Sequence, residues 1–272
     1  MEYIQRSTFI SYTETFNILK KFSDLVEYPQ IDRMPNYLLV SETNNGKSAL
    51  LREFESRYQV KNSPETGPQL TVLYFQAPAK ADESRLYSTI LEHLNHPHND
   101  SDIASNKLKQ VKRLINSLGI RILIIDELHN IAPSTATKQR EFLTILKYLS
   151  NELKISMICA GTPAVYDVIT YDPQVANRFE PINLISWNKK PEDFIAFLKR
   201  YEQRLPLKNA SNLAQRELAS KIFKMGEGLL GEYVTILKKA GVLAIESKDE
   251  KITLDILSKI SFIPPSERSR HS

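Results

Sequence analysis

Short apolar runs alternate with stretches of helical periodicity over about the first 185 residues. The apolar runs predict strands over residues 37–40, 70–76, 120–126, 155–161 and 179–185. The stretches between them predict helices over residues 13–27, 84–94, 104–118 and 137–152, and one more that ends at about residue 58. The run Ile122–Ile125 is apolar at every position, which is typical of a parallel strand buried on both faces. The pattern therefore predicts an α/β fold, with a parallel five-stranded sheet sandwiched by helices.

The strand pattern stops after about Trp187, and only helical periodicity continues. It predicts helices over residues 191–204, 212–225, 230–245 and 253–261. We therefore expect an N-terminal segment and helix over residues 1–36, a nucleotide-binding α/β domain over 37–187 and a C-terminal helical lid over 188–262. The last residues, 263–272, contain two prolines and no apolar periodicity, so we expect a flexible tail there.

Composition is that of an ordinary folded protein, with 42% hydrophobic and 25% charged residues. No apolar stretch approaches the roughly 18 residues that a membrane span needs, and no secretory signal is apparent, so we expect a cytoplasmic protein that does not enter a membrane. The single cysteine, Cys159, lies in an apolar run and is expected to be a packed core thiol.

Charge is distributed unevenly, although the net charge is only +4 (36 basic and 32 acidic residues). Residues 1–186 carry 20 basic and 21 acidic side chains, whereas residues 187–272 carry 16 and 11. The positive excess of the last third is suited to contact with phosphate backbones. Solvated faces of exposed helices explain it equally well.

A phosphate-binding loop is predicted between the first strand and its helix, over Ser41–Ser48 (sequence SETNNGKS). Backbone N–H groups of such a loop and of the helix that follows form a concavity for anions. We expect Asn44, Asn45, Gly46 and Ala49 to surround the phosphates. Lys47 is expected to reach the β- and γ-phosphates, and Ser48 to offer its hydroxyl to Mg²⁺. Ser41 stands where the full pattern has a glycine.

A second motif follows about 80 residues later, where the apolar strand 120–126 ends in two acidic residues. Asp126 is expected to hold Mg²⁺, mainly through waters. Glu127 is expected to orient and polarise the attacking water. An exposed turn is the usual explanation of an Asp-Glu pair after a strand, but here the pair follows a phosphate-loop motif at a suitable distance. The two motifs together predict a Mg²⁺–nucleotide site.

Two further candidates lie at strand ends. Thr162 follows the fourth strand and is suited to sense the γ-phosphate or the attacking water; a turn threonine is the alternative. Arg178 precedes the fifth strand, where an arginine finger is able to reach the nucleotide of a neighbouring subunit; an ordinary surface arginine is the alternative.

With these residues placed, the chain resembles AAA+ ATPases of the TniB/TnsC type, the ATP-dependent regulators of Tn-family DNA transposition. The segments that carry the resemblance occur in the expected order: residues 33–40 (RMPNYLLV), 43–48 (TNNGKS), 123–127 (LIIDE), 160–163 (AGTP), 177–179 (NRF) and 226–231 (GEGLLG). The resemblance covers about residues 10–260.

The resemblance implies a P-loop sheet of the ASCE type, in which the Thr162 strand separates the Asp126 strand from the phosphate-loop strand. It implies ATP and Mg²⁺ as cofactors, with Lys47 and Ser48 as Walker A residues and Asp126 and Glu127 as Walker B residues. Thr162 matches sensor 1 and Arg178 the finger, and adenine is expected at residues 10–12.

The partners that the resemblance implies are double-stranded DNA, a transposase, a TniQ-like target-selection adaptor and further copies of the chain in a ring or helical filament. In this interpretation the bacterial protein assembles on DNA with ATP, recruits or activates the transposase, and disassembles on hydrolysis. Lys80 and Arg85, after the second strand, are the candidate DNA phosphate contacts, with a solvated helix surface as the equal alternative.

Two departures from the family pattern motivate a second hypothesis. Ser41 replaces a loop glycine, and Glu232 stands where many AAA+ proteins carry an arginine. A nucleotide-gated scaffold with negligible turnover fits these departures, and a helicase-loader or initiator-like AAA+ protein is a third possibility.

Overall fold

The computed structural model describes residues 9–63, 65, 67–170, 173–185, 187 and 191–268. Its Cα positions divide into two compact units. Residues 17–42 and 47–184 form the first, which we call the sheet unit. The described residues within 1–16, 43–46 and 185–272 form the second, which we call the helical unit. Each is described by itself.

The sheet unit contains five parallel strands in the order β4 (Val72–Gln76), β5 (Ile122–Asp126), β6 (Ser156–Gly161), β1 (Asn36–Val40) and β7 (Phe179–Asn183). The predicted parallel five-stranded P-loop sheet is therefore confirmed, and β6 separates β5 from β1 as the resemblance implies. Because all five strands run the same way, Val40, Asp126 and Gly161 end at the same edge of the sheet.

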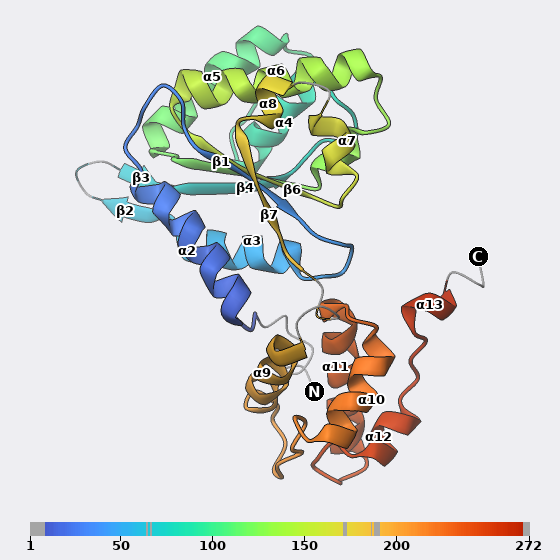
Figure 1. The fold of residues 1–272 in the computed structure, drawn as a ribbon. Coiled ribbons are helices and arrows are strands. Elements are labelled where there is room, and N and C mark those ends of the chain that lie inside the picture. Colours follow the sequence, from blue (N-terminus) through green and yellow to red (C-terminus); the bar gives the residue numbers. More distant parts are fainter. Residues whose placement is uncertain are drawn as a thin grey trace. The chain divides into compact units, whose positions relative to one another are not determined.

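Helices cover both faces of this sheet (Figure 1). They are α2 (Thr13–Glu27), α3 (Lys47–Ser56), α4 (Glu83–His93), α5 (Ala104–Leu118), α6 (Ala136–Leu153), α7 (Val165–Ile169) and α8 (Pro173–Ala176), with a 3₁₀ turn η1 (Leu128–Ile131). Side chains alternate along each strand, so Phe75, Leu123 and Met157 share one core with α4, α5 and α6. On the opposite face, Phe22 of α2 packs edge-on against Phe54 of α3, with ring centroids 5.4 Å apart.

Gly119 explains why α5 stops just before β5. Its φ of 67° is left-handed, and its N–H bonds to the carbonyls of Ile115 and Asn116. A Cβ at this position would lie 2.5 Å from Oε1 at the end of the Gln69 side chain, which is able to move, so the left-handed backbone is what favours glycine here. The predicted helix end at Leu118 is thus confirmed, whereas the strand begins at Ile122, two residues later than predicted.

A small antiparallel hairpin lies in a segment for which the sequence pattern predicts no strand. β2 (Lys61–Ser63) pairs with β3 (Gly67–Gln69), with Lys61 opposite Gln69 and Asn62 opposite Pro68. Each strand has three residues and no apolar alternation, so the sequence carries no strand signal there.

The helical unit contains α9 (Pro191–Glu202), α10 (Arg216–Gly226), α11 (Leu230–Glu246), α12 (Leu254–Lys259) and α13 (Pro265–Arg268). An aromatic cluster forms its core. The ring centroid of Trp187 lies 4.8 Å from that of Phe197, 5.1 Å from that of Tyr12 and 5.6 Å from that of Tyr233. The rings of Trp187 and Tyr233 are stacked. Burial raises the pKa of Tyr233 to about 12, as expected for a phenol packed in this core.

Two segments of the helical unit differ from the predicted pattern. Residues 212–215 precede α10 instead of belonging to it, because the Glu202 carboxylate accepts hydrogen bonds from the N–H groups of Ser211, Asn212 and Leu213. In the segment expected to be a flexible tail, Pro265–Arg268 form α13, which is attached to the unit by side-chain contacts. Residues 269–272 lie outside the described residues.

Candidate functional site

The loop that follows β1 has the backbone geometry of a phosphate-binding loop. Asn44 and Gly46 have positive φ angles of 61° and 84°, and α3 begins at Lys47. The backbone of Ser41 does not have a positive φ angle, so the serine side chain causes no backbone strain there. Its N–H donates to the carbonyl of Gly161 at 3.2 Å, which continues the β1–β6 pairing into the loop. A serine therefore fits this structure where the family pattern has glycine.

Lys47 and Glu127 meet at the edge of the sheet unit. Lys47 Nζ lies 3.3 Å from Glu127 Oε1, and the lysine side chain is only 6% exposed. The first turn of α3 also carries the two other predicted contacts in this unit, Ser48, which is half-buried, and Ala49, which is exposed. The helix N-terminus and a buried ammonium group thus lie on the same turn, which favours a bound anion.

Asp126 is completely buried at the end of β5. Its Oδ1 accepts the N–H of Glu127 at 2.8 Å, and its Oδ2 accepts the hydroxyl of Tyr74 at 2.9 Å. Burial of the phenol is the main cause that raises the pKa of Tyr74, and the nearby Asp126 carboxylate raises it further. Tyr74 therefore remains a proton donor at neutral pH. The two donors fix the orientation of the carboxylate.

Oxygen ligands at this edge suit Mg²⁺. Asp126 and Ser48 supply a carboxylate and a hydroxyl, and each oxygen of the fixed carboxylate retains a lone pair beyond its hydrogen bond. Among the described residues, no group of three or more His, Cys, Asp or Glu side chains is arranged to hold a metal. A site with one or two protein oxygens fits Mg²⁺ held largely by phosphates and water, which is how this ion is usually bound.

His129 connects Glu127 to the end of β6. The N–H of Thr162 donates to His129 Nδ1 at 3.3 Å, and His129 Nε2 lies 3.2 Å from Glu127 Oε2. Because Nδ1 accepts, the proton of a neutral ring is on Nε2, which then donates to the carboxylate. Gly161 leaves room for this ring, since a Cβ there would lie 3.2 Å from Nδ1.

Arg178 lies just before β7, as predicted. Its Nη1 donates to the side-chain oxygen of Asn151 in α6, within the same chain. Arg33 reaches the carbonyl of the neighbouring Asn177 at 3.4 Å. The side chain that matches an arginine finger is therefore held by its own subunit here, and its role toward another subunit stays a prediction.

The segment where adenine is expected, residues 10–12, is part of the helical unit's core. Tyr12 is 2% exposed, and Arg200 and Arg204 of the same unit donate to the carbonyls of Ser11 and Phe9. Burial raises the pKa of Tyr12. The backbone of this segment is thus fixed by side chains that follow it by nearly 200 residues.

The candidate DNA contacts, Lys80 and Arg85, are both exposed on the sheet unit. Two nearby basic residues have structural partners instead. Lys107 is buried and donates to Ser84 Oγ and the carbonyl of Asp100, each at 3.0 Å, and Lys112 pairs with Glu152 at 2.8 Å. The role of Lys80 and Arg85 stays a prediction.

On the helical unit, Gly46 and Asn44 contact the start of α11. A Cβ on Gly46 would lie 2.4 Å from Leu230 Cδ2, and the N–H of Gly231 donates to the carbonyl of Asn44 at 2.9 Å. Asn45, the remaining predicted loop residue, is 3% exposed. The loop tip is thus packed closely against one helix.

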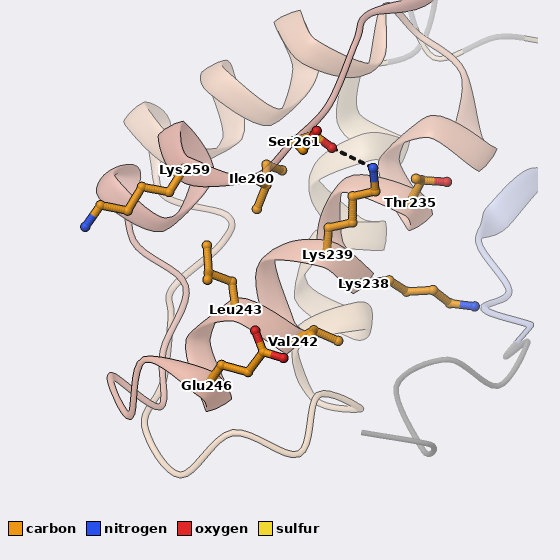
Figure 2. A pocket seen from close by; sticks show the side chains of 9 residues that line it. All are labelled: Thr235, Lys238, Lys239, Val242, Leu243, Glu246, Lys259, Ile260 and Ser261. Carbon is orange, nitrogen blue, oxygen red and sulfur yellow. Dashed lines mark hydrogen bonds between the residues drawn. The ribbon is translucent and has the colours of Figure 1, made fainter.

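A groove of about 440 Å³ lies elsewhere on this unit, between α11 and the end of α12 (Figure 2). Its lining includes Val242, Leu243 and Ile260, with Lys239 bonded to the carbonyl of Ser261 at 2.6 Å. No residue of the phosphate loop contributes to it. It is separate from the candidate site.

Three functional candidates escaped sequence analysis: Tyr74, His129 and Arg268, which pairs with Glu232. Tyr74 lies inside an apolar strand and is indistinguishable there from a core residue. His129 follows Glu127 by two residues, and this closeness was the only available signal.

The fold and this geometry define a P-loop protein of the AAA+ class. The Aeropyrum pernix ORC2 protein, solved in ADPNP–ADP complexes, matches all of this chain and 74% of its own with a TM-score of 0.69 and 14% identity. The A. pernix ORC1 protein in complex with DNA matches 99% of this chain and 68% of its own, with a TM-score of 0.67 and 15% identity. A Walker-type ATPase of Pyrococcus abyssi matches 92% of this chain and 73% of its own, with a TM-score of 0.60 and 16% identity.

The model of the bacterial TniB protein family matches residues 1–189. The chain therefore belongs to the TniB family, and the resemblance seen in its motifs is confirmed. No curated protein matches the chain. Along the described residues, no helix is both long and apolar enough to cross a lipid bilayer.

Proposed function

We propose that this protein is an ATPase that binds ATP and Mg²⁺ at residues 41–49, Asp126 and Glu127. The observation that carries the proposal is the meeting of Lys47, Asp126 and Glu127 at one edge of the sheet. A buried cation, a fixed carboxylate and a carboxylate that is able to orient water are the groups that phosphoryl transfer to water requires.

In this proposal each residue has a distinct task. The loop N–H groups and Lys47 bind the β- and γ-phosphates, and Ser48 and Asp126 hold Mg²⁺, which supplies charge neutralisation when bound. When Lys47 binds the phosphates it leaves Glu127, and a water molecule takes its place beside the carboxylate. Glu127 orients this water toward the γ-phosphorus. Glu127 accepts a proton from this water as the water oxygen bonds to the γ-phosphorus, the bond between phosphorus and the bridging oxygen breaks with its electron pair passing to ADP, and ADP and inorganic phosphate leave. Thr162 senses the γ-phosphate from the end of β6.

We further propose that ATP drives assembly of several copies on double-stranded DNA, and that the assembly recruits or activates a transposase through a TniQ-like adaptor in the bacterial cytoplasm. Membership of the TniB family supports the transposition context. The positive excess of the last third supports contact with DNA, as do exposed Lys80 and Arg85. Arg178 is proposed to contact the nucleotide of the neighbouring copy after it leaves Asn151.

A second candidate, a nucleotide-gated DNA-binding scaffold with negligible turnover, is favoured by the pairing of Glu127 with both Lys47 and His129. A glutamate held by two donors is not available to polarise water until one donor leaves. Phosphate release separates the two functions. The ATPase should release phosphate with ATP and Mg²⁺, faster when double-stranded DNA is present, whereas a scaffold should bind ATP without release.

Assembly is tested by electron microscopy of the purified chain with ATP, Mg²⁺ and linear double-stranded DNA. Rings or filaments on DNA are expected with ATP and should be lost with ADP. A strictly monomeric protein under all of these conditions would contradict the assembly part of the proposal.

A further inference from the structure

Arg268 of α13 is linked to the tip of the phosphate loop through a single carboxylate. Its Nη1 and Nη2 donate to Oε1 and Oε2 of Glu232 at 2.8 and 2.6 Å, a bidentate pair. Glu232 Oε1 also accepts Nδ2 of Asn44 at 2.8 Å. All three residues belong to the helical unit, so the chain of contacts lies within one compact body.

Glu232 is a buried charge, since only 4% of the residue is exposed. Removing a carboxylate from water costs free energy unless donors and an opposite charge replace its hydration. Here Asn44 donates one hydrogen bond, Arg268 donates two with a positive charge, and the first turn of α11 adds its favourable dipole. Arg268 is thus the only one of the three that cancels the charge.

Neighbouring contacts hold α13 where Arg268 is needed. Ser266 donates its N–H and its hydroxyl to the carboxylate of Glu227 at 3.0 and 2.5 Å, and Arg268 Nε donates to the carbonyl of Ile263 at 2.9 Å. The Arg268 guanidinium also lies 5.4 Å from the ring centroid of Phe262. The helix is therefore fixed at both ends, and the guanidinium is oriented before a nucleotide binds.

The position of Glu232 makes its charge relevant to phosphate. Asn44 has a left-handed backbone and lies in the loop whose N–H groups are proposed to surround the phosphates. A Cβ on Gly231 would lie 1.8 Å from Asn44 Oδ1, so the asparagine side chain is packed directly against α11. An uncompensated carboxylate one side chain away from this loop would repel a polyphosphate.

We propose that Arg268 is a positioning residue for nucleotide binding, which neutralises Glu232 and so lets the loop tip at Asn44 accept the polyphosphate of ATP. In this proposal α13 acts on the tip of the phosphate loop through Glu232 and Asn44, although it follows the loop by more than 200 residues. The proposal rests on the proposed ATP site.

The test is a double-mutant cycle read by the dissociation constant of a fluorescent ATP analogue. Arg268→Ala should weaken binding on the order of tenfold, because one negative charge is left near the loop. Glu232→Gln removes that charge and keeps an acceptor for Asn44, so the double variant Arg268→Ala/Glu232→Gln should bind within about twofold of the unchanged protein. The deficit of Arg268→Ala should also shrink at high salt, because salt screens the repulsion.

Lys259→Ala is the matched control, because it removes an exposed positive charge of the same unit, paired with Asp255 at 2.5 Å. It should leave nucleotide binding unchanged. Equal binding by Arg268→Ala and the unchanged protein would overturn the inference, as would a deficit that neither Glu232→Gln nor salt relieves. If the unchanged protein binds no nucleotide, the proposed ATP site itself fails, which is a distinguishable result.

Discussion

Lys47 and Glu127 form an ion pair across the edge of the sheet, with Nζ and Oε1 3.3 Å apart. The two residues come from motifs 80 positions apart. Each has a different proposed ligand, and in this structure the ion pair takes the place of both ligands. Lys47 is expected to bind phosphate and Glu127 to bind water. Binding of ATP should therefore break the pair and free both groups for these tasks.

Replacing Lys47 by alanine should abolish nucleotide binding. The variant loses the buried ammonium group that is proposed to bind the phosphates, and Glu127 loses the cation paired with it. Titration with a fluorescent ATP analogue measures the loss. Lys112→Ala, which removes a partly buried lysine paired with Glu152 in the same unit, should bind normally. Normal binding by Lys47→Ala would remove this lysine from the site.

Glu127→Gln should bind ATP and turn it over slowly, by roughly 10²–10⁴-fold relative to the unchanged protein, because the amide cannot polarise the attacking water. Phosphate release under saturating ATP gives the rate. The variant should also remain assembled on DNA with ATP, since the ATP-bound state is trapped. Unchanged turnover would show that Glu127 does not act on water.

His129→Ala should lower the maximal turnover and leave the KM for ATP nearly unchanged. The histidine contacts Glu127 and the backbone of Thr162, so we expect it to position the glutamate and not to bind phosphate. Asparagine at this position, which retains a donor, should restore part of the turnover. A change in KM of the same size as the change in turnover would instead place His129 in nucleotide binding.

Cys159 should be inert to thiol reagents in the folded protein. The residue is fully buried in β6, and burial raises the pKa of its thiol, so the thiolate fraction at neutral pH is negligible. Because the unfolded thiol ionises near pH 8.5, this group also makes the folded state less stable as the pH rises above that value, by about 1.4 kcal/mol per pH unit.

Reactivity with a chromogenic disulfide at pH 8, with and without urea, measures this protection. Reaction should appear only across the unfolding transition. Cys159→Ala provides the blank, and rapid reaction of the native protein would contradict the buried position of the thiol.

Hydrophobic pattern alone predicted the positions of the strands well, because β1, β4, β5 and β6 are largely apolar runs, and β7 still has buried Phe179 and Ile182 on either side of Glu180 and Pro181. The order of the strands required the family resemblance, since no property of an individual strand reports its neighbours. β2 and β3 were missed because three-residue strands without apolar alternation leave no pattern.

The candidate site divides in the same way. Lys47, Asp126 and Glu127 were predictable because their roles require particular residues next to a strand or helix. Tyr74 and Arg268 were not, because each is linked to the site only by a contact with a residue distant in sequence: Asp126 for the tyrosine and Glu232 for the arginine. A four-residue helix such as α13 is also too short to show periodicity.

Trp187 is the only tryptophan of the chain, and it is packed against Tyr12, Phe197 and Tyr233 in the core of the helical unit. Cys159, the only cysteine, lies in the core of the sheet unit. Each unit thus carries one native spectroscopic or chemical reporter that the other lacks. Tryptophan emission and thiol exposure, followed together through urea without any label, will tell whether the two units unfold as one cooperative body or in succession.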